Sequence, residues 1–282
     1  MEAMGLHVPG SAFASPVSEL RHALTDEAAR LLVENSRHGS RFLPLAVQID
    51  AKALVNGAVA LLASGGSTNH ALHLPAIARA AGYELTWEDL AELSKVVPLL
   101  AHVYPSGVAD VNQFHAAGGV AWLFKQLLDA GFMHRDVSTV AGQGLQAYAR
   151  EPYLNNHKLE WRDVPKDSQA PSILRASTEP FARHSGLHLL AGNLGRAIVK
   201  TSAVKEEFWA VKAPARVFDT EAEVLAAYNA GVLVGDLVLV LRFQGPAANG
   251  MPELHKLMPL LANLQANGQK VALVTDGRLS GA

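Results

Sequence analysis

The first half of the chain repeats apolar residues at the spacing of amphipathic helices. Thr25 is the expected N-cap of a first helix that ends before Gly39, and Thr86, with an acid three residues later, is the expected N-cap of another. The same spacing predicts further helices over residues 50–63, 70–81 and 111–130 and, more weakly, 138–149. Residues 94–100 are typical of a helix end followed by a short buried strand. This half is therefore expected to be rich in helix.

The second half has a different pattern. A polar stretch over residues 151–171 is the best candidate for a domain boundary. Beyond it, apolar β-branched runs alternate with helical patterns, which predicts parallel strands in an α/β domain. Strands are expected at 197–200, 215–218, 237–241 and 271–274, with helices at 221–230 and 252–267. The fold class is α/β: a helix-rich domain over residues 1–170 and a second α/β domain over 171–282.

Composition narrows the function classes. The 282 residues are 49% hydrophobic, with 24 Lys and Arg against 26 Asp and Glu, so the net charge is −2 and no basic stripe suits a nucleic-acid partner. The sequence has no apolar run long enough to cross a membrane and no basic signal-peptide start, so we expect a cytoplasmic protein without a membrane partner. The absence of cysteine excludes disulfides and thiolate metal ligands within this sequence.

A glycine-rich turn is the first candidate site. Gly65 and Gly66 precede Ser67, Thr68 and Asn69 between two predicted helices. Side-chain donors at the start of a helix suit a carboxylate or phosphate, because the helix N-terminus carries free N–H groups and positive partial charge. The alternative is an ordinary turn in which Ser67 or Thr68 caps the helix.

Two further candidates follow the strongest predicted strands. Glu253 lies in the loop after the strand at 237–241, where ligands bind in open α/β sheets. Its carboxylate suits Mg²⁺, although it could equally complement the dipole of a helix that begins at Pro252. Ser280 lies between Leu279 and Gly281 after the strand at 271–274, where it is either an exposed reactive hydroxyl or part of a glycine turn.

Six short strings together carry a family resemblance. They resemble, in order along the chain, motifs of the iron–sulfur dehydratases that include dihydroxy-acid and phosphogluconate dehydratases. The strings are Gly5–Ser11, Gly65–His70, Phe114–Gly119, Gly192–Arg196, Gly250–Glu253 and Asp276–Gly281. The sequence from Arg242 to Leu257 is similar to the phosphogluconate branch in particular.

The resemblance implies a lyase of the Entner–Doudoroff pathway. It would convert 6-phospho-D-gluconate, a phosphorylated sugar acid, to 2-dehydro-3-deoxy-6-phospho-D-gluconate and water. By resemblance, Ser280 is the catalytic base and Glu253 a ligand of Mg²⁺. Ser67, Thr68 and Asn69 would bind substrate oxygens, and Arg278 is a weaker candidate for an anionic group. The second domain is expected to be an incomplete swivelling β/β/α-like domain, in a protein that is a homodimer at full length.

The chain also departs from the family. Family members are longer, and the cysteines that hold their iron–sulfur cluster, of the 4Fe-4S type by resemblance, have no counterpart here. We therefore expect the sequence to be the central part of a longer dehydratase, inactive alone. The alternatives are a dihydroxy-acid or other sugar-acid dehydratase, and a non-catalytic remnant with weak anion binding.

Overall fold

The structure, a computed structural model, describes residues 1–279 and divides into two compact units. Unit 1 comprises Met1–Gly66 and His70–Ile198, and unit 2 comprises Ser67–Asn69 and the chain from Val199 onward. Both units mix helices with strands, so the expected α/β class is confirmed. The domain boundary predicted near residue 170 stays a prediction.

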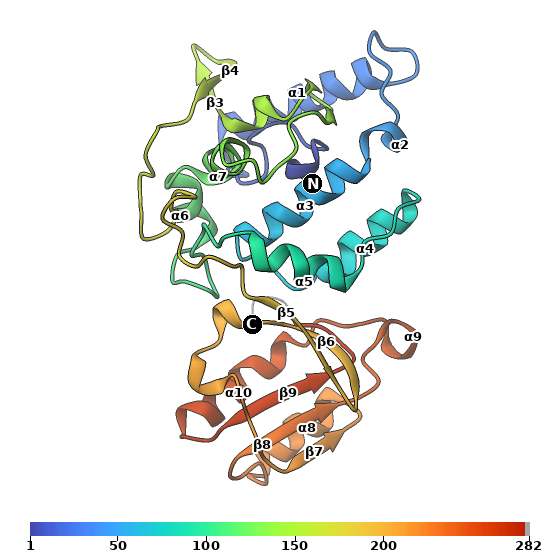
Figure 1. Cartoon of the computed structure of the whole chain (residues 1–282), viewed down its shortest axis with the longest axis vertical. Helices are drawn as coiled ribbons and strands as arrows, with labels where there is room; N and C mark the ends of the chain where they lie inside the picture. Colours follow the sequence, from blue (N-terminus) through green and yellow to red (C-terminus); the bar gives the residue numbers. More distant parts are fainter. Residues whose placement is uncertain (280–282) are drawn as a thin grey trace. The chain divides into compact units, whose positions relative to one another are not determined.

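Unit 1 is built mainly of helices (Figure 1). The helices are α1 (Glu19–Asn35), α2 (Leu45–Gln48), α3 (Ala51–Ala63), α4 (His70–Ala80), α5 (Trp87–Val96), α6 (Val111–Ala116) and α7 (Gly119–Asp129). Two short antiparallel hairpins accompany them: β1 (Ser138–Thr139) with β2 (Gly142–Gln143), and β3 (Arg150–Asn155) with β4 (Lys158–Asp163). Strands β5 (Leu187–Gly192) and β6 (Gly195–Lys200) pair in a third two-stranded sheet, and the chain passes into unit 2 within β6. Buried faces of α3 and α7, including Val59 and Trp122, form its core.

Local capping signals fixed several of these helices. Asp50 accepts a hydrogen bond from the Ala53 amide and begins α3, as its predicted range of 50–63 implies. Thr86 and Asp89 form a reciprocal capping box at the start of α5, which confirms that prediction.

The N-cap predicted at Thr25 is wrong. α1 begins at Glu19, and the Ser18 hydroxyl accepts from the Arg21 amide. Thr25 lies inside α1, where its hydroxyl donates to the Arg21 carbonyl. Two cap candidates compete in this sequence, and the earlier one gives a longer helix that buries both Leu24 and Leu31.

Four other predicted stretches of unit 1 differ from the structure. The helix expected over 111–130 is two helices, because Gly118 and Gly119 adopt φ values of 127° and 58°. The stretch 138–149 forms β1, β2 and a short 3₁₀ turn rather than a helix.

The polar stretch 151–171 contains most of the β3–β4 hairpin, closed by Asn156 and His157 in left-handed conformation. In residues 94–100 the expected helix end is present, since α5 ends at Val96, but the expected short strand is reduced to isolated bridges from Leu99 to Ala182 and from Ala101 to Leu174.

Unit 2 contains a parallel sheet. Its strands are β7 (Ala215–Phe218), β8 (Leu237–Leu241) and β9 (Val271–Thr275), with β8 in the middle (Figure 1). The helices are α8 (Glu221–Asn229), α9 (Pro246–Asn249) and α10 (Met258–Ala266). Leu239 of β8 packs in one cluster with Val224 of α8 and Leu260 of α10, so the predicted parallel α/β arrangement is confirmed. The helix expected at 252–267 begins later, at Met258.

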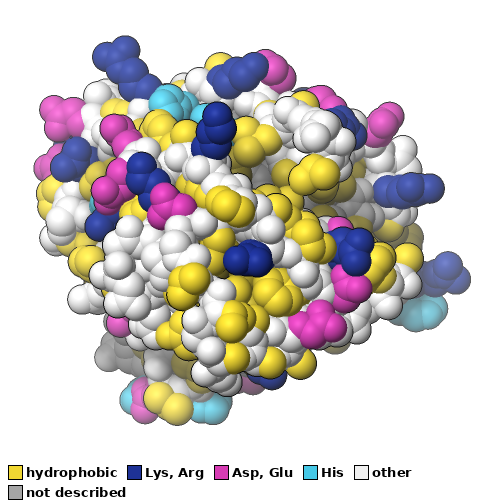
Figure 2. Space-filling model, turned by 90° about the horizontal axis from the view of Figure 1, so that it is seen from below, with side chains coloured by type: hydrophobic (Ala, Val, Ile, Leu, Met, Phe, Trp, Pro, Cys, Tyr) yellow, Lys and Arg dark blue, Asp and Glu magenta, His cyan; other side chains and the backbone are white. Residues whose placement is uncertain are grey.

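The described surface mixes charges of both signs. Figure 2 shows Lys and Arg side chains interspersed with Asp and Glu on one face, among many apolar side chains. Among the described residues, no helix is both long and apolar enough to span a bilayer.

Candidate functional site

The candidate site lies where β8 and β9 end. Because the two strands are parallel, their carboxyl ends meet at the same edge of the sheet, as the pairing of Leu241 with Thr275 shows. The loop after β8 leads to Glu253, and the segment after β9 begins with Asp276 and includes Arg278. In open α/β sheets this edge is where ligands bind.

Asp276 joins the two loops. Its carboxylate accepts hydrogen bonds from the Gln244 amide at 2.9 Å and from the Gly245 amide at 3.0 Å. A side chain at Gly245 would not fit here without a shift, because a Cβ would lie 3.0 Å from Asp276 Oδ2. Asp276 therefore fixes the start of the loop that carries Glu253.

Gln244 extends this network toward β7 and α9. Its side-chain amide donates to the carbonyls of Asp219 at 3.0 Å and Arg242 at 2.8 Å. Its side-chain oxygen accepts from Asn249 at 3.1 Å, at the end of α9. Gln244 is 2% exposed, so these bonds satisfy a polar side chain inside the unit.

Glu253 and Arg278 lie side by side. The Arg278 Nη1 is 3.4 Å from Glu253 Oε2, and its Nε donates to the Met251 carbonyl at 3.0 Å. The two residues also form a parallel β-bridge, and the Leu254 amide donates to the Arg278 carbonyl at 3.4 Å. Both side chains are about a third exposed, at 32% for Glu253 and 29% for Arg278.

The backbone before Glu253 turns sharply. Gly250 and Met251 have φ values of 67° and 58°, a left-handed conformation that is uncommon for methionine. Glu253 precedes α10, which begins at Met258, so the alternative in which it complements a helix beginning at Pro252 is wrong. Its carboxylate lies beside the Arg278 guanidinium.

The Ser67–Asn69 segment belongs to unit 2 and contacts the same region. The Thr68 hydroxyl donates to the Leu279 carbonyl at 3.0 Å, and Ser67 Oγ accepts from the Asn69 amide at 3.2 Å. Asn69 Oδ1 is buried and accepts no hydrogen bond from the residues that the structure describes. A buried acceptor without a donor is costly unless a ligand supplies one.

The predicted site residues are thus partly brought together. Glu253 contacts Arg278, and Thr68 contacts Leu279. Ser280, the predicted base, lies outside the described residues. The roles assigned to all six predicted residues stay predictions.

Sequence reasoning gave no role to Asp276 or Gln244. An acid directly after a buried strand was the available signal for Asp276, because carboxylates at strand ends often accept loop amides. Gln244 carried no such signal, since its partners lie in three different segments.

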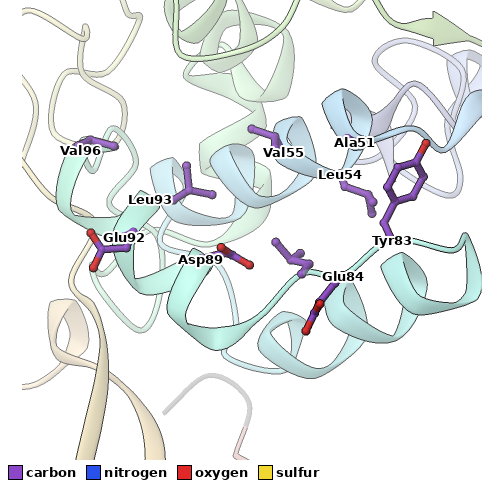
Figure 3. Close-up of a pocket in the computed structure, with 10 residues that line it drawn as sticks. Ala51, Leu54, Val55, Tyr83, Glu84, Asp89, Glu92, Leu93 and Val96 are labelled. Carbon is purple, nitrogen blue, oxygen red and sulfur yellow. The ribbon is translucent and has the colours of Figure 1, made fainter.

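Two cavities lie elsewhere, in unit 1. One of about 590 Å³ lies between α3 and α5, and Figure 3 shows Leu54, Leu93 and Val96 lining it with Tyr83 and acidic side chains. A second, of about 470 Å³, lies beside α5 and is lined by His184 and His188. None of the predicted site residues lines either cavity.

The residues of this chain suit only one of the two metal groups that the family resemblance implies. An iron–sulfur cluster needs thiolate ligands, and the sequence has no cysteine, so its residues do not fit that group. Glu253 offers an oxygen ligand of the kind that Mg²⁺ prefers. The described residues form no group of three His, Asp or Glu side chains placed to hold a metal, so Glu253 would supply one ligand of several.

Relatives of this chain cover its whole length. It is 56% identical to a phosphogluconate dehydratase of Pseudomonas aeruginosa and 53% identical to one of Escherichia coli, in both cases over 100% of the chain. It is 36% identical to a dihydroxy-acid dehydratase of Caldanaerobacter subterraneus. The chain spans about half the length of these curated relatives, at 46%, 47% and 48%.

Two family models match successive parts of the sequence. The dihydroxy-acid/6-phosphogluconate dehydratase N-terminal model matches residues 1–148, and the corresponding C-terminal model matches residues 172–282. The second match covers the loops that carry Glu253 and Arg278. The resemblance found in the six sequence strings is therefore confirmed, and the chain belongs to the dihydroxy-acid/6-phosphogluconate dehydratase family.

Proposed function

We propose that this chain forms part of a lyase that dehydrates 6-phospho-D-gluconate to 2-dehydro-3-deoxy-6-phospho-D-gluconate in the Entner–Doudoroff pathway. The observation that carries the proposal is 56% identity to a phosphogluconate dehydratase along the whole chain. The contact between Glu253 and Arg278 supports it, because it unites two of the predicted site residues at one sheet edge.

The reaction removes the proton from C2 and the hydroxyl from C3, which together make the water that is lost. The resulting enol becomes the 2-keto product. Ser280 is the proposed base for the C2 proton. A serine alkoxide forms only beside positive charge, because the pKa of a free hydroxyl is far above neutral pH, and Arg278 is two residues away in sequence.

Other residues would bind the substrate. Ser67, Thr68 and Asn69 supply hydroxyl and amide groups for its oxygens, and the buried Asn69 Oδ1 suits a substrate hydroxyl as donor. Glu253 would be one ligand of Mg²⁺, which when bound stabilises negative charge that develops on the substrate carboxylate and 2-hydroxyl. The family's iron–sulfur cluster would need cysteines that this sequence does not contain.

The longer protein is proposed to be a cytoplasmic homodimer without nucleic-acid or membrane partners, as its resemblance to the family implies. Light scattering of an active form tests the dimer. A second candidate activity is dihydroxy-acid dehydration, which the 36% identity to such an enzyme favours.

A chimera tests the function. The 282 residues replace the matching segment of the Pseudomonas aeruginosa phosphogluconate dehydratase, which supplies the rest of the enzyme. We expect 2-keto acid formation from 6-phosphogluconate and far less from dihydroxyisovalerate. The reverse preference would favour the second candidate, and a folded chimera inactive on both would contradict the proposal.

Two substitutions in the chimera test the site. Ser280→Ala should lower kcat by about 10²–10⁴-fold, the usual range for a general base. Glu253→Gln should lower turnover with partial recovery in excess Mg²⁺, because it keeps the side chain's shape and removes its charge. Glu179→Gln, which changes another glutamate outside these loops, is the control and should leave turnover unchanged.

A further inference from the structure

We propose that Asp276 is a positioning residue, one that sets the location of the Glu253 carboxylate by holding the loop in which Glu253 lies. The inference deepens the proposed function and rests on it, since it concerns the same site. It assigns Asp276 no contact with substrate.

The first step is the contact itself. Asp276 is the first residue after β9, and its two carboxylate oxygens accept from two successive backbone amides, Gln244 at 2.9 Å and Gly245 at 3.0 Å. Hydrogen bonds to an ionised carboxylate are stronger than those between neutral groups. The pair of bonds fixes both the distance and the orientation of the loop start relative to β9.

The second step connects this contact to Glu253. Gln244 is buried, and its side-chain oxygen accepts a hydrogen bond from Asn249 at the end of α9. The end of α9 is therefore connected through Gln244 to Asp276. From there the chain turns through Gly250 and Met251 to Glu253. The start of the loop is held by Asp276, and its end is held by Arg278 through the Met251 carbonyl and the Glu253 carboxylate.

The third step is that one short segment makes both attachments. Asp276 and Arg278 are separated only by Gly277, and a Cβ on Gly277 would lie 2.8 Å from the Gln244 Cβ and 3.1 Å from a Leu254 methyl carbon. The segment therefore packs closely against both ends of the loop. A shift at Asp276 would therefore move the proposed metal ligand, Glu253, relative to the end of β9.

The test compares Asp276→Asn with a matched control, Asp236→Asn. Asp236 is also exposed and also accepts from a backbone amide, that of Lys270 at 2.7 Å, but at the opposite end of β8 and β9. In the 282-residue chain, we expect amide hydrogen exchange over residues 242–254 to become faster in Asp276→Asn and to stay unchanged in Asp236→Asn. Unchanged exchange in both variants would overturn the proposal that Asp276 holds this loop.

A second substitution disturbs the same contact without changing charge. Gly245 has φ −67°, which alanine also adopts, but the added Cβ would lie 3.0 Å from Asp276 Oδ2. Gly245→Ala should therefore speed exchange over the same residues. Gly192→Ala is its control, because a Cβ there has no heavy atom within 4 Å. This pair keeps the test decisive if Asp276→Asn does not fold.

Kinetics in the chimera separate positioning from mere stability. Misplacing a catalytic group by about 1 Å can cost on the order of 10²-fold in rate. We expect kcat to fall about 10- to 100-fold in Asp276→Asn, with KM for 6-phosphogluconate changed less than about twofold, and both values to be unchanged in Asp236→Asn. Full kcat in Asp276→Asn would overturn the positioning role, whereas an inactive parent chimera would contradict the proposed function and leave the exchange test valid.

Discussion

The Arg278 guanidinium lies 3.4 Å from the Glu253 carboxylate, and the same side chain donates to the Met251 carbonyl. One arginine thus contacts both the backbone and the carboxylate of a single turn. The arrangement places a positive charge beside the only carboxylate that the family resemblance assigns to metal binding in this chain.

The Glu253–Arg278 pair should contribute little to stability. Both side chains are about a third exposed, at 32% and 29%, and ion pairs of this kind are worth at most about 1 kcal/mol. A double-mutant cycle with Glu253→Gln and Arg278→Gln, measured by urea unfolding, should give a coupling energy below that value. A coupling of several kcal/mol would mean that the pair is structural rather than available to a ligand.

Loss of the α5 capping box should be measurable. Thr86→Ala removes the acceptor for the Asp89 amide and should destabilise unit 1 by about 1 kcal/mol. Thr25→Ala is the control, since that threonine lies inside α1 and caps nothing. Thermal unfolding followed by circular dichroism checks the difference, and equal shifts in Tm would show that the capping box is not formed.

The central strand of unit 2 should be sensitive to truncation. Leu239 is 0% exposed in β8, and Leu239→Ala should cost about 2–5 kcal/mol because it leaves a cavity in the core. Val217→Ala in β7, where the side chain is 54% exposed, should cost much less. Limited proteolysis with mass spectrometry would localise the effect, and cleavage confined to unit 1 would contradict it.

Glu2 should give unit 1 a pH-dependent stability. Burial raises the pKa of its carboxyl from 4.5 to about 7, although the Gly10 and Ala12 amides both donate to it. Well below pH 4.5 the Glu2 carboxyl is protonated in both the folded and the unfolded chain. Between pH 4.5 and about 7 it is mostly ionised in the unfolded chain and mostly protonated in the folded one. The contribution of Glu2 to stability is therefore lost as the pH rises through this window.

Unfolding free energies measured at several pH values test this dependence of stability on pH. Glu2→Gln should make the free energy of unfolding less dependent on pH between 4.5 and about 7. Glu179→Gln serves as the comparison, since Glu179 is exposed. An unchanged slope in Glu2→Gln would show that Glu2 does not titrate in this window.

The purified 282-residue chain should contain no iron–sulfur cluster. Such clusters are held by thiolates, and the sequence has none to offer. Iron and acid-labile sulfide analysis after anaerobic reconstitution checks this. Stoichiometric iron and sulfide would show that other ligands replace cysteine.

The sequence by itself determined the elements whose signals are local. Asp50 and Thr86 are caps within three residues of the amides they bind, so α3 and α5 begin as predicted. The apolar runs at 237–241 and 271–274 predicted β8 and β9, because short continuous apolar runs that alternate with helical patterns are typical of parallel strands. Since both strands were expected to be parallel, the loop that carries Glu253 and the segment after β9 follow their carboxyl ends, at one edge of the sheet.

Only the tertiary structure decided the features that depend on distant partners. The β3–β4 hairpin forms within a polar sequence because cross-strand contacts such as Tyr153 with Glu160 stabilise it. Thr68 reaches the Leu279 carbonyl across 211 residues, and Asp276 reaches Gln244 across 32. Hydrogen bonds of this kind follow from the packing of whole strands and loops, which local residue patterns do not encode.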